Sequence, residues 1–439
     1  MVLIIGEVDN DEVIVCFLER FTDIWNYQDY RFRVPAFEPT FLKIKLNRTD
    51  RTVFSFQSDQ TGKILTGSVT RFPSTAWVVS CNNRHVIRPC TIWPKISYTK
   101  TDIVFHLGDQ IYADRIYWRW WRYLCNMNPS KWHLYQKDIQ MEYHREYIET
   151  WEPLQSVFAH SSNIMIPDDH EIRSRASLWE CLSSGKGIHG LPHSFEYYLG
   201  GASGKKFRSL TEQCFDTALS FRNSDLESFL FDLALEVCKN LYLGLRLTNR
   251  GNFDYFKVIN NVNVIMHERI TQPFISESFQ KNCQTFLQRS SAQRILFMGG
   301  LPPVPIRPNF FEVLFYRYTN TIDDEQYIKL YELFQDRPSI YLGGDLHVGV
   351  AGEIILNGKN LGQFHIASPS SGFCSIYIPQ DSIGSPNGYQ LRINQYSASN
   401  PNAVQIDLEQ FKSKHVFSPG SFVEAWQNTL SAGLCFWSD

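Results

Sequence analysis

The sequence IVFHLGDQIYAD, at residues 103–114, joins a short and mostly apolar run to a glycine and an aspartate. A run of this length that stops at a glycine is typical of a strand buried on both faces of a sheet. Gly108 allows a sharp turn, and the spacing of Asp109 and Tyr112 lets one turn of chain point both side chains the same way. Because ligands of α/β sheets bind beyond the carboxyl ends of strands, this turn is a candidate binding site.

Five further apolar runs of the same kind flank this strand. They are residues 76–80, 163–167, 262–266, 294–298 and 339–342. Residues 139–159, 225–244 and 323–335 carry apolar side chains in helical patterns between them. Strands that alternate with helices predict an α/β protein whose sheet is covered on both faces.

Side chains that can bind metal follow four of the predicted strands directly. They are found in CNNRH at 81–85, GDQIY at 108–112, DDHE at 168–171 and GGDLH at 343–347. One such cluster is a weak signal, since an aspartate after a glycine is usually a turn residue. Four clusters at the same edge of one sheet predict a metal site for phosphate chemistry, where carboxylates hold cations and a bound water becomes hydroxide near neutral pH.

The domain organisation follows from length and pattern. The chain has 439 residues and is 43% hydrophobic and 20% charged, which is typical of a globular protein with more than one folding unit. We predict a small, β-rich, sandwich-like domain at residues 1–72 and a larger α/β domain at 76–439. Residues 174–225 contain many glycines and predict an insertion that could form a lid.

Charge and cysteine usage limit the partners and the compartment. A net charge of -3 without long runs of one sign excludes a generic basic surface for nucleic acid, but a small phosphate ester remains a fitting substrate. Ten cysteines without a CxxC pair indicate free thiols in a reducing compartment. The first residues do not resemble a signal peptide and no apolar stretch approaches a membrane span, so we expect an intracellular, cytoplasmic protein.

Three of the motifs carry a family resemblance. HLGDQIYAD, MIPDDHEIR and YLGGDLHVG resemble the signatures of the PhoD-like alkaline phosphatases, a branch of the calcineurin-like metallophosphoesterases. Ser80 and Cys81 resemble the SC step that ends the first catalytic strand of this family. The resemblance covers roughly residues 76 to 375. It implies a four-layer α/β/β/α fold with a multinuclear metal centre, and a small β-sandwich-like domain often precedes such a fold.

The resemblance also implies a role for each matching residue. The implied metal ligands are Cys81, Asp109, Tyr112, Asp169, Asp345 and His347, and the implied catalytic residues are His170, Arg173 and Arg269. Asp109 would bridge the metals, and His347 would be a ligand or a close neighbour of one. His170 would lie beside the scissile phosphate, to steady its charge or to protonate the leaving oxygen. Asp168 and Glu171 would orient these groups without binding metal themselves.

The donor atoms of these implied ligands indicate which metals the site would bind. A thiolate and a phenolate suit an oxidised iron better than magnesium, whereas carboxylates suit calcium. The resemblance implies two or more ions, and the donors favour iron with calcium, with zinc or manganese as alternatives. The predicted function is hydrolysis of phosphate mono- or diesters by metal-bound hydroxide.

One strand end departs from the family pattern and leaves an alternative open. His267 stands where the family usually has an aspartate, while Arg269 matches. His267 could be a metal ligand, but we expect a structural or orienting role, because a lone histidine more often has one. The departure motivates the alternative of a catalytically degenerate domain that binds a partner or ligand. The polar residues kept at the other strand ends argue against it, since such groups are costly to bury without a role.

Residues 115–123 hold three arginines and three tryptophans. Such a segment could stack a base and clamp phosphate, which would favour a nuclease or nucleotide phosphodiesterase that depends on Trp118 and Trp121. We expect an amphipathic helix instead, with the tryptophans packed on the sheet and the arginines in solvent.

Overall fold

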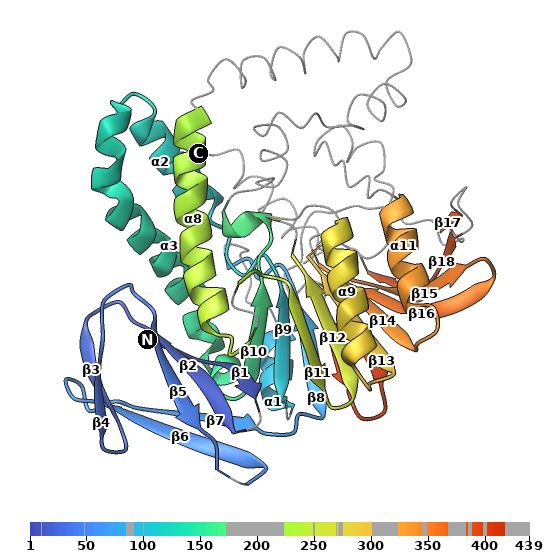
Figure 1. The fold of residues 1–439 in the computed structure, drawn as a ribbon. Helices are drawn as coiled ribbons and strands as arrows, with labels where there is room; N and C mark the ends of the chain where they lie inside the picture. Colours follow the sequence, from blue (N-terminus) through green and yellow to red (C-terminus); the bar gives the residue numbers. More distant parts are fainter. Residues whose placement is uncertain are drawn as a thin grey trace.

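The computed structural model shows a mixed α/β protein (Figure 1). It describes residues 1–9, 11–47, 49–84, 92–99, 101–172, 224–248, 251–268, 270, 275–300, 324–344, 349–367, 383–384, 389–397 and 402–417. Four predicted site residues lie outside this part of the chain, namely Arg173, Arg269, Asp345 and His347. Nearly all of the predicted insertion at 174–225 lies outside it as well.

A five-stranded sheet contains the strand that ends before Gly108. Its order is β10 (Ser162–Ile166), β9 (Ile103–Leu107), β8 (Thr75–Val79), β19 (Asn402–Asp407) and β20 (Lys412–Phe417). The strands β8, β9 and β10 are parallel, with Ile166 of β10 opposite Leu107 of β9. Their carboxyl ends therefore meet at one edge, and the three strands that the sequence predicts here are confirmed.

An eight-stranded sheet holds the other predicted strands, so the expectation that all of these strands lie in one sheet is wrong. Its order is β11 (Tyr255–Ile259), β12 (Val262–His267), β13 (Arg294–Gly299), β14 (Ser339–Gly343), β16 (Lys359–Ile366), β15 (Gly349–Leu356), β18 (Tyr389–Ser397) and β17 (Ile383–Gly384). The strands β12, β13, β14 and β16 are parallel, so that His267, Gly299 and Gly343 lie in one row at their carboxyl ends.

The two sheets face each other across a shared apolar core. In β9, Phe105 points into this core, whereas its neighbour Val104 packs against helices on the outer face. In β13, Leu296 and Phe297 divide between the two faces in the same way. Because both faces of each strand are covered, the strands are mostly apolar, as the sequence pattern predicts.

Helices cover the outer face of each sheet (Figure 1). On the side of the five-stranded sheet lie α1 (Ile92–Tyr98), η1 (Pro129–Tyr135), α3 (Gln136–Trp151), η2 (Glu152–Leu154), α4 (Gln155–Phe158) and α8 (Ser224–Gly244), and α2 (Asp114–Leu124) packs against α3 and α8. Against the eight-stranded sheet lie α9 (Glu277–Arg289) and α11 (Asp324–Phe334). The helical pattern at 139–159 divides into α3, η2 and α4, because Pro153 has no N–H to continue the ladder of α3.

The N-terminal residues form two smaller antiparallel sheets. One has the order β1 (Val2–Asp9), β2 (Glu12–Leu18) and β5 (Thr40–Lys45), and the other β4 (Tyr30–Val34), β3 (Asp23–Tyr27), β6 (Arg51–Ser58) and β7 (Ile64–Thr70). Along β1, Leu3 and Ile5 pack between these two sheets, whereas Val2 and Ile4 enter the core beneath α3 and α8. The alternation of side chains along one strand thus joins the N-terminal sheets to the rest of the molecule.

The helix α2 is amphipathic, as predicted for the segment rich in tryptophan and arginine. Its buried side is made by Ile116, Tyr117 and Leu124, and Trp121 packs partly against the same core. The expectation that the tryptophans pack on the sheet is wrong for Trp118, which is 40% exposed because it lies on the outer side of the helix. In the part of the chain that the structure describes, no helix has the length and hydrophobicity needed to cross a bilayer.

Candidate functional site

The turn after β9 is built around Gly108 and Asp109. Gly108 has φ +87°, and a Cβ placed on it would lie 2.2 Å from Cβ of Asp168. Asp109 follows with φ 54°, in the left-handed region that is strained for a residue with a side chain, and it is fully buried. The glycine therefore lets the turn after β9 pack directly against the turn after β10.

The turn after β10 is the short 3-10 helix η3 (Asp169–Glu171), closed by a capping box. The Asp168 carboxylate accepts a hydrogen bond from the backbone N–H of Asp169 at 2.7 Å, and the Glu171 carboxylate accepts one from the N–H of Asp168 at 2.8 Å. Glu171 also accepts hydrogen bonds from the backbone N–H groups of Asp109 and Gln110, at 2.9 and 2.6 Å. One buried carboxylate therefore ties the two turns together.

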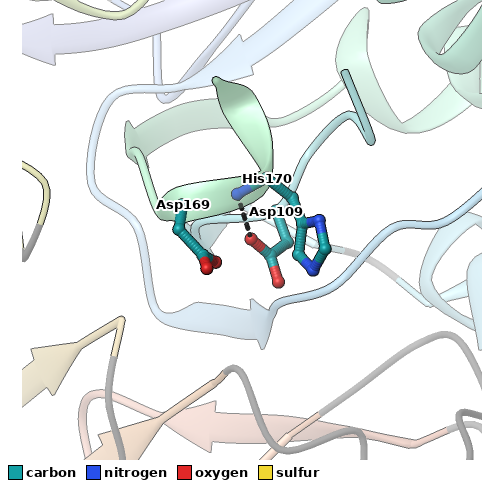
Figure 2. A group of neighbouring side chains, drawn as sticks. All are labelled: Asp109, Asp169 and His170. Carbon is teal, nitrogen blue, oxygen red and sulfur yellow. Dashed lines mark hydrogen bonds between the residues drawn. The ribbon is translucent and has the colours of Figure 1, made fainter. Parts of the chain in front are cut away.

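The two turns bring three possible metal ligands side by side (Figure 2). Ligand atoms of Asp109, Asp169 and His170 all lie within 4.8 Å of one another. The backbone N–H of His170 also donates to Oδ1 of Asp109 at 3.3 Å. Two buried carboxylates this close repel each other in a medium of low dielectric constant, and a cation between them relieves that repulsion. This group could therefore hold a metal ion.

The ring of His170 is fixed by two neighbours from the stretch that follows Asp109. Its Nδ1 lies 2.6 Å from Oδ2 of Asp114, the first residue of α2, and its ring centroid lies 4.2 Å from that of Tyr112. Burial lowers the pKa of His170, but the carboxylates of Asp114, Asp109 and Asp169 outweigh it and hold the pKa well above its usual value. These carboxylates therefore favour the protonated form of His170.

Asp114 is a residue that sequence reasoning missed. Asp114 lies in the sequence motif at 103–114, five residues after Asp109. An aspartate in the first turn of a helix is usually explained by its interaction with the helix dipole, so the sequence gives no separate indication that Asp114 contacts His170.

The strand end at β8 places Cys81 beside this group. The backbone N–H of Cys81 donates to the carbonyl of Gly108 at 3.2 Å, and that of Asn82 donates to the carbonyl of Asp109 at 2.7 Å. Cys81 is buried and adopts φ 58°, and its sulfur lies 3.1 Å from the Ser80 hydroxyl oxygen. Among the described residues, the compact group that could hold a metal does not include its sulfur.

Tyr112 and the end of β14 also lie at this edge. The phenol oxygen of Tyr112 is 3.5 Å from Oδ2 of Asp109. A Cβ placed on Gly344 would lie 2.0 Å from Oγ of Ser80, so β14 and β8 end against each other. The structure therefore brings the predicted residues of three strand ends together, and it carries β14 to the same place one residue before Asp345.

His267 ends β12 in a closed environment. Its Nδ1 lies 3.0 Å from Oδ1 of Asp254, and its ring centroid lies 4.2 Å from that of Phe279 on α9. A carboxylate that holds one nitrogen of a histidine is found both in structural histidines and in those that bind metal through the other nitrogen. Both interpretations of His267 therefore stay open.

The comparison with protein families fits this geometry. The PhoD-like phosphatase family matches residues 76–175, which run from β8 through η3 and contain Asp109, Asp169 and His170. This segment of the chain is similar to PhoD-like phosphatases. The family resemblance and the prediction of a phosphatase enzyme are thereby confirmed. A comparison with curated protein sequences gives no significant match.

Two solved structures share the fold of this chain. The structure of PhoD matches with a TM-score of 0.55 at 11% identity, over 99% of this chain and 97% of that chain. Purple acid phosphatase PPD1 from seeds of yellow lupin (Lupinus luteus) matches with a TM-score of 0.51 at 10% identity, over 98% of this chain and 76% of that chain. At such identities the likeness is one of fold, and it agrees with the predicted α/β class.

Proposed function

We propose that this chain hydrolyses phosphate mono- or diesters at a metal centre built on the turns after β9 and β10. The observation that carries the proposal is the compact group of Asp109, Asp169 and His170 inside the segment that matches PhoD-like phosphatases. Fold alone does not establish a reaction, but a buried group of ligands at the carboxyl ends of strands is a chemical reason for one.

The proposed centre is multinuclear. Its proposed ligands are Cys81, Asp109, Tyr112, Asp169, Asp345 and His347, with Asp109 placed to bridge. The mixture of carboxylate, phenol and thiol donors supports iron with calcium, and zinc or manganese are the alternatives. Metal ions bound there would supply an activated water and neutralise charge that develops on the phosphate.

The residues of the chain itself would hold the substrate and handle one proton. Asp114 occupies Nδ1 of His170, so Nε2 is the nitrogen that remains for the substrate or for a metal. In the proposed reaction Nε2 donates its proton to the leaving oxygen, and the Asp114 carboxylate keeps the ring oriented. Arg173 and Arg269 are proposed to bind phosphate oxygens, which the planar guanidinium can contact in pairs.

The arrangement of layers supports a related proposal about domains. The two sheets that share a core, with helices on their outer faces, are consistent with a four-layer α/β/β/α catalytic domain at 76–439. The two antiparallel sheets before it are consistent with a β-sandwich-like domain at 1–72. Residues 174–225 would be an insertion of the catalytic domain.

The decisive experiment is elemental analysis of the purified protein together with hydrolysis of p-nitrophenyl phosphate and bis-p-nitrophenyl phosphate. Bound iron, zinc, manganese or calcium near stoichiometric amounts, with turnover abolished by a chelator and restored by the ions, is the expected result. The preferred ester then distinguishes a monoesterase from a diesterase. Absence of both metal and turnover after the ions are added back would favour the degenerate binding domain instead.

A further inference from the structure

Glu171 has a fourth hydrogen-bond donor, which comes from a distant part of the chain. The phenol of Tyr242, near the end of α8, donates to Oε1 of Glu171 at 2.8 Å. Both side chains are fully buried. Tyr242 thus reaches the carboxylate that also receives the backbone N–H groups of Asp109, Gln110 and Asp168.

This carboxylate supports a strained part of the backbone. Asp109 adopts φ 54°, a conformation that is strained for a residue with a side chain and persists only where neighbours enforce it. The N–H of Asp109 points at Oε2 of Glu171, and the N–H of Gln110 points at Oε1. Successive N–H groups that converge on one anion hold such a turn in place. Glu171 is therefore the group that keeps the Asp109 side chain aimed at Asp169 and His170.

Tyr242 in turn holds Glu171. Its ring packs against Trp151 and Phe253, and its oxygen is 3.5 Å from that of Tyr147, which donates to it. The hydrogen bond from Tyr147 to Tyr242 is long, at 3.5 Å, whereas the hydrogen bond from Tyr242 to Glu171 is short, at 2.8 Å. Oε1 of Glu171 accepts from both Tyr242 and Gln110, so the phenol fixes the oxygen that holds the second N–H of the turn.

We propose that Tyr242 is a positioning residue for the reaction, acting through Glu171 on the backbone of Asp109. The proposal rests on the proposed function, because it concerns the same metal and phosphate site. It adds a residue from α8, outside the segment 76–175 that matches the family. Without the phenol, Glu171 keeps its backbone donors but can rotate within the space left by the missing oxygen. The Asp109 carboxylate then loses its fixed direction.

Tyr242→Phe tests this proposal, with Tyr147→Phe as the matched control. Both substitutions remove one buried phenol oxygen and keep the ring, but only the first removes a hydrogen bond to Glu171. The full-length variants are compared with the wild-type protein by competition for the bound metal against a chelator, by kcat and KM on the preferred p-nitrophenyl ester, and by thermal unfolding.

For Tyr242→Phe we expect metal affinity and kcat to fall roughly tenfold each, the effect typical of losing a group that orients a metal ligand. KM should stay within about twofold, since the phosphate-binding side chains are untouched. Tyr147→Phe should match the wild type within about twofold in metal affinity and kcat. The two variants should unfold at temperatures similar to each other, because each loses one buried phenol oxygen.

The outcomes separate this proposal from the proposed function. A wild-type protein without metal and turnover overturns both. An active wild type with Tyr242→Phe and Tyr147→Phe alike in metal affinity and kcat overturns only the role of Tyr242. If Tyr242→Phe does not fold, Glu171→Gln is the second test. Its amide NH2 replaces one of the carboxylate oxygens that accept backbone N–H groups, so one donor of the turn then faces another donor. Metal affinity equal to that of the wild type in that variant also overturns the proposal.

Discussion

Nδ1 of His170 lies 2.6 Å from Oδ2 of Asp114, so the first residue of α2 holds the middle residue of η3. The main chain reinforces this contact, because the N–H of Ala113 donates to the carbonyl of His170 at 2.9 Å. The turn after β9 therefore supplies both Asp109, a proposed metal ligand, and the group that orients the proposed acid. One continuous motif serves two roles.

Asp114→Asn tests the role of this contact. The amide keeps a similar shape and can still accept a hydrogen bond, but it no longer stabilises a charged imidazole. We expect kcat on the preferred ester to fall roughly tenfold to a hundredfold while bound metal stays unchanged. Asp138→Asn is the matched control, since Asp138 is likewise an acidic residue in the first turn of a helix but is exposed and remote in sequence from the motifs. If kcat falls equally in both variants, the effect of Asp114 comes from the helix dipole and not from its contact with His170.

Asp109→Asn tests the proposed bridging ligand. Asparagine tolerates the left-handed conformation as well as aspartate does, so the turn with φ 54° should survive and the fold should be kept. We expect metal content to drop below half of the wild-type value. Activity should fall more than about a hundredfold, beyond the usual effect of losing a group that only orients a ligand. Elemental analysis, circular dichroism and turnover measure the three properties. Full activity in a well-folded variant would end the assignment of Asp109.

The sequence predicts the parallel strands of both sheets well, and the physical reason is simple. A strand such as Ile103–Leu107 is covered on both faces, so its residues are apolar except for the buried His106, and the glycine after it marks its end. The same pattern predicts that polar groups gather beyond the strand ends. The close approach of Gly344 to Ser80 shows that strands from two sheets end against each other, whereas the sequence pattern predicts a single sheet.

Two features of the site could not be predicted in this way. Asp114 begins a helix, where an acidic residue has an ordinary explanation, and only the structure shows its contact with His170. Tyr242 lies in an apolar helix pattern far along the chain from Glu171, and no local pattern reports a hydrogen bond between distant residues. Both contacts depend on tertiary packing, which periodicity along the sequence does not contain.

Gly108→Ala should be strongly destabilising. The position combines φ +87° with a Cβ that would lie 2.2 Å from Cβ of Asp168, so the two turns of the site must separate. We expect a loss of roughly 3 kcal/mol or more in the free energy of unfolding, measured by urea denaturation. Gly358→Ala is the control, because Gly358 has φ +80° but nothing within 4 Å of its added Cβ. It should cost only about 1 kcal/mol, the strain of the left-handed conformation. Similar losses in the two variants would mean that the close packing of Gly108 on Asp168 has no energetic weight.

His144 provides a test of how pH acts on stability. It is buried on α3, and neither ring nitrogen has a hydrogen-bond partner within the described part of the chain. Burial lowers the pKa of His144 to about 4, from a usual value near 6.5. Between these values the unfolded chain binds a proton that the folded chain does not. The contribution of His144 to stability is therefore complete above about pH 6.5 and is lost as the pH falls towards 4.

His144→Leu should remove this dependence. At pH 7 the variant should be at least as stable as the wild type, because leucine fills a similar space without an unpaired polar group. Between pH 7 and pH 5 the wild type should lose about 2 kcal/mol more than the variant in the free energy of unfolding. Urea denaturation at the two pH values measures the difference, and His133→Gln on the exposed part of η1 should behave as the wild type does. An equal loss in the wild type and His144→Leu would show that His144 is not held neutral in the folded protein.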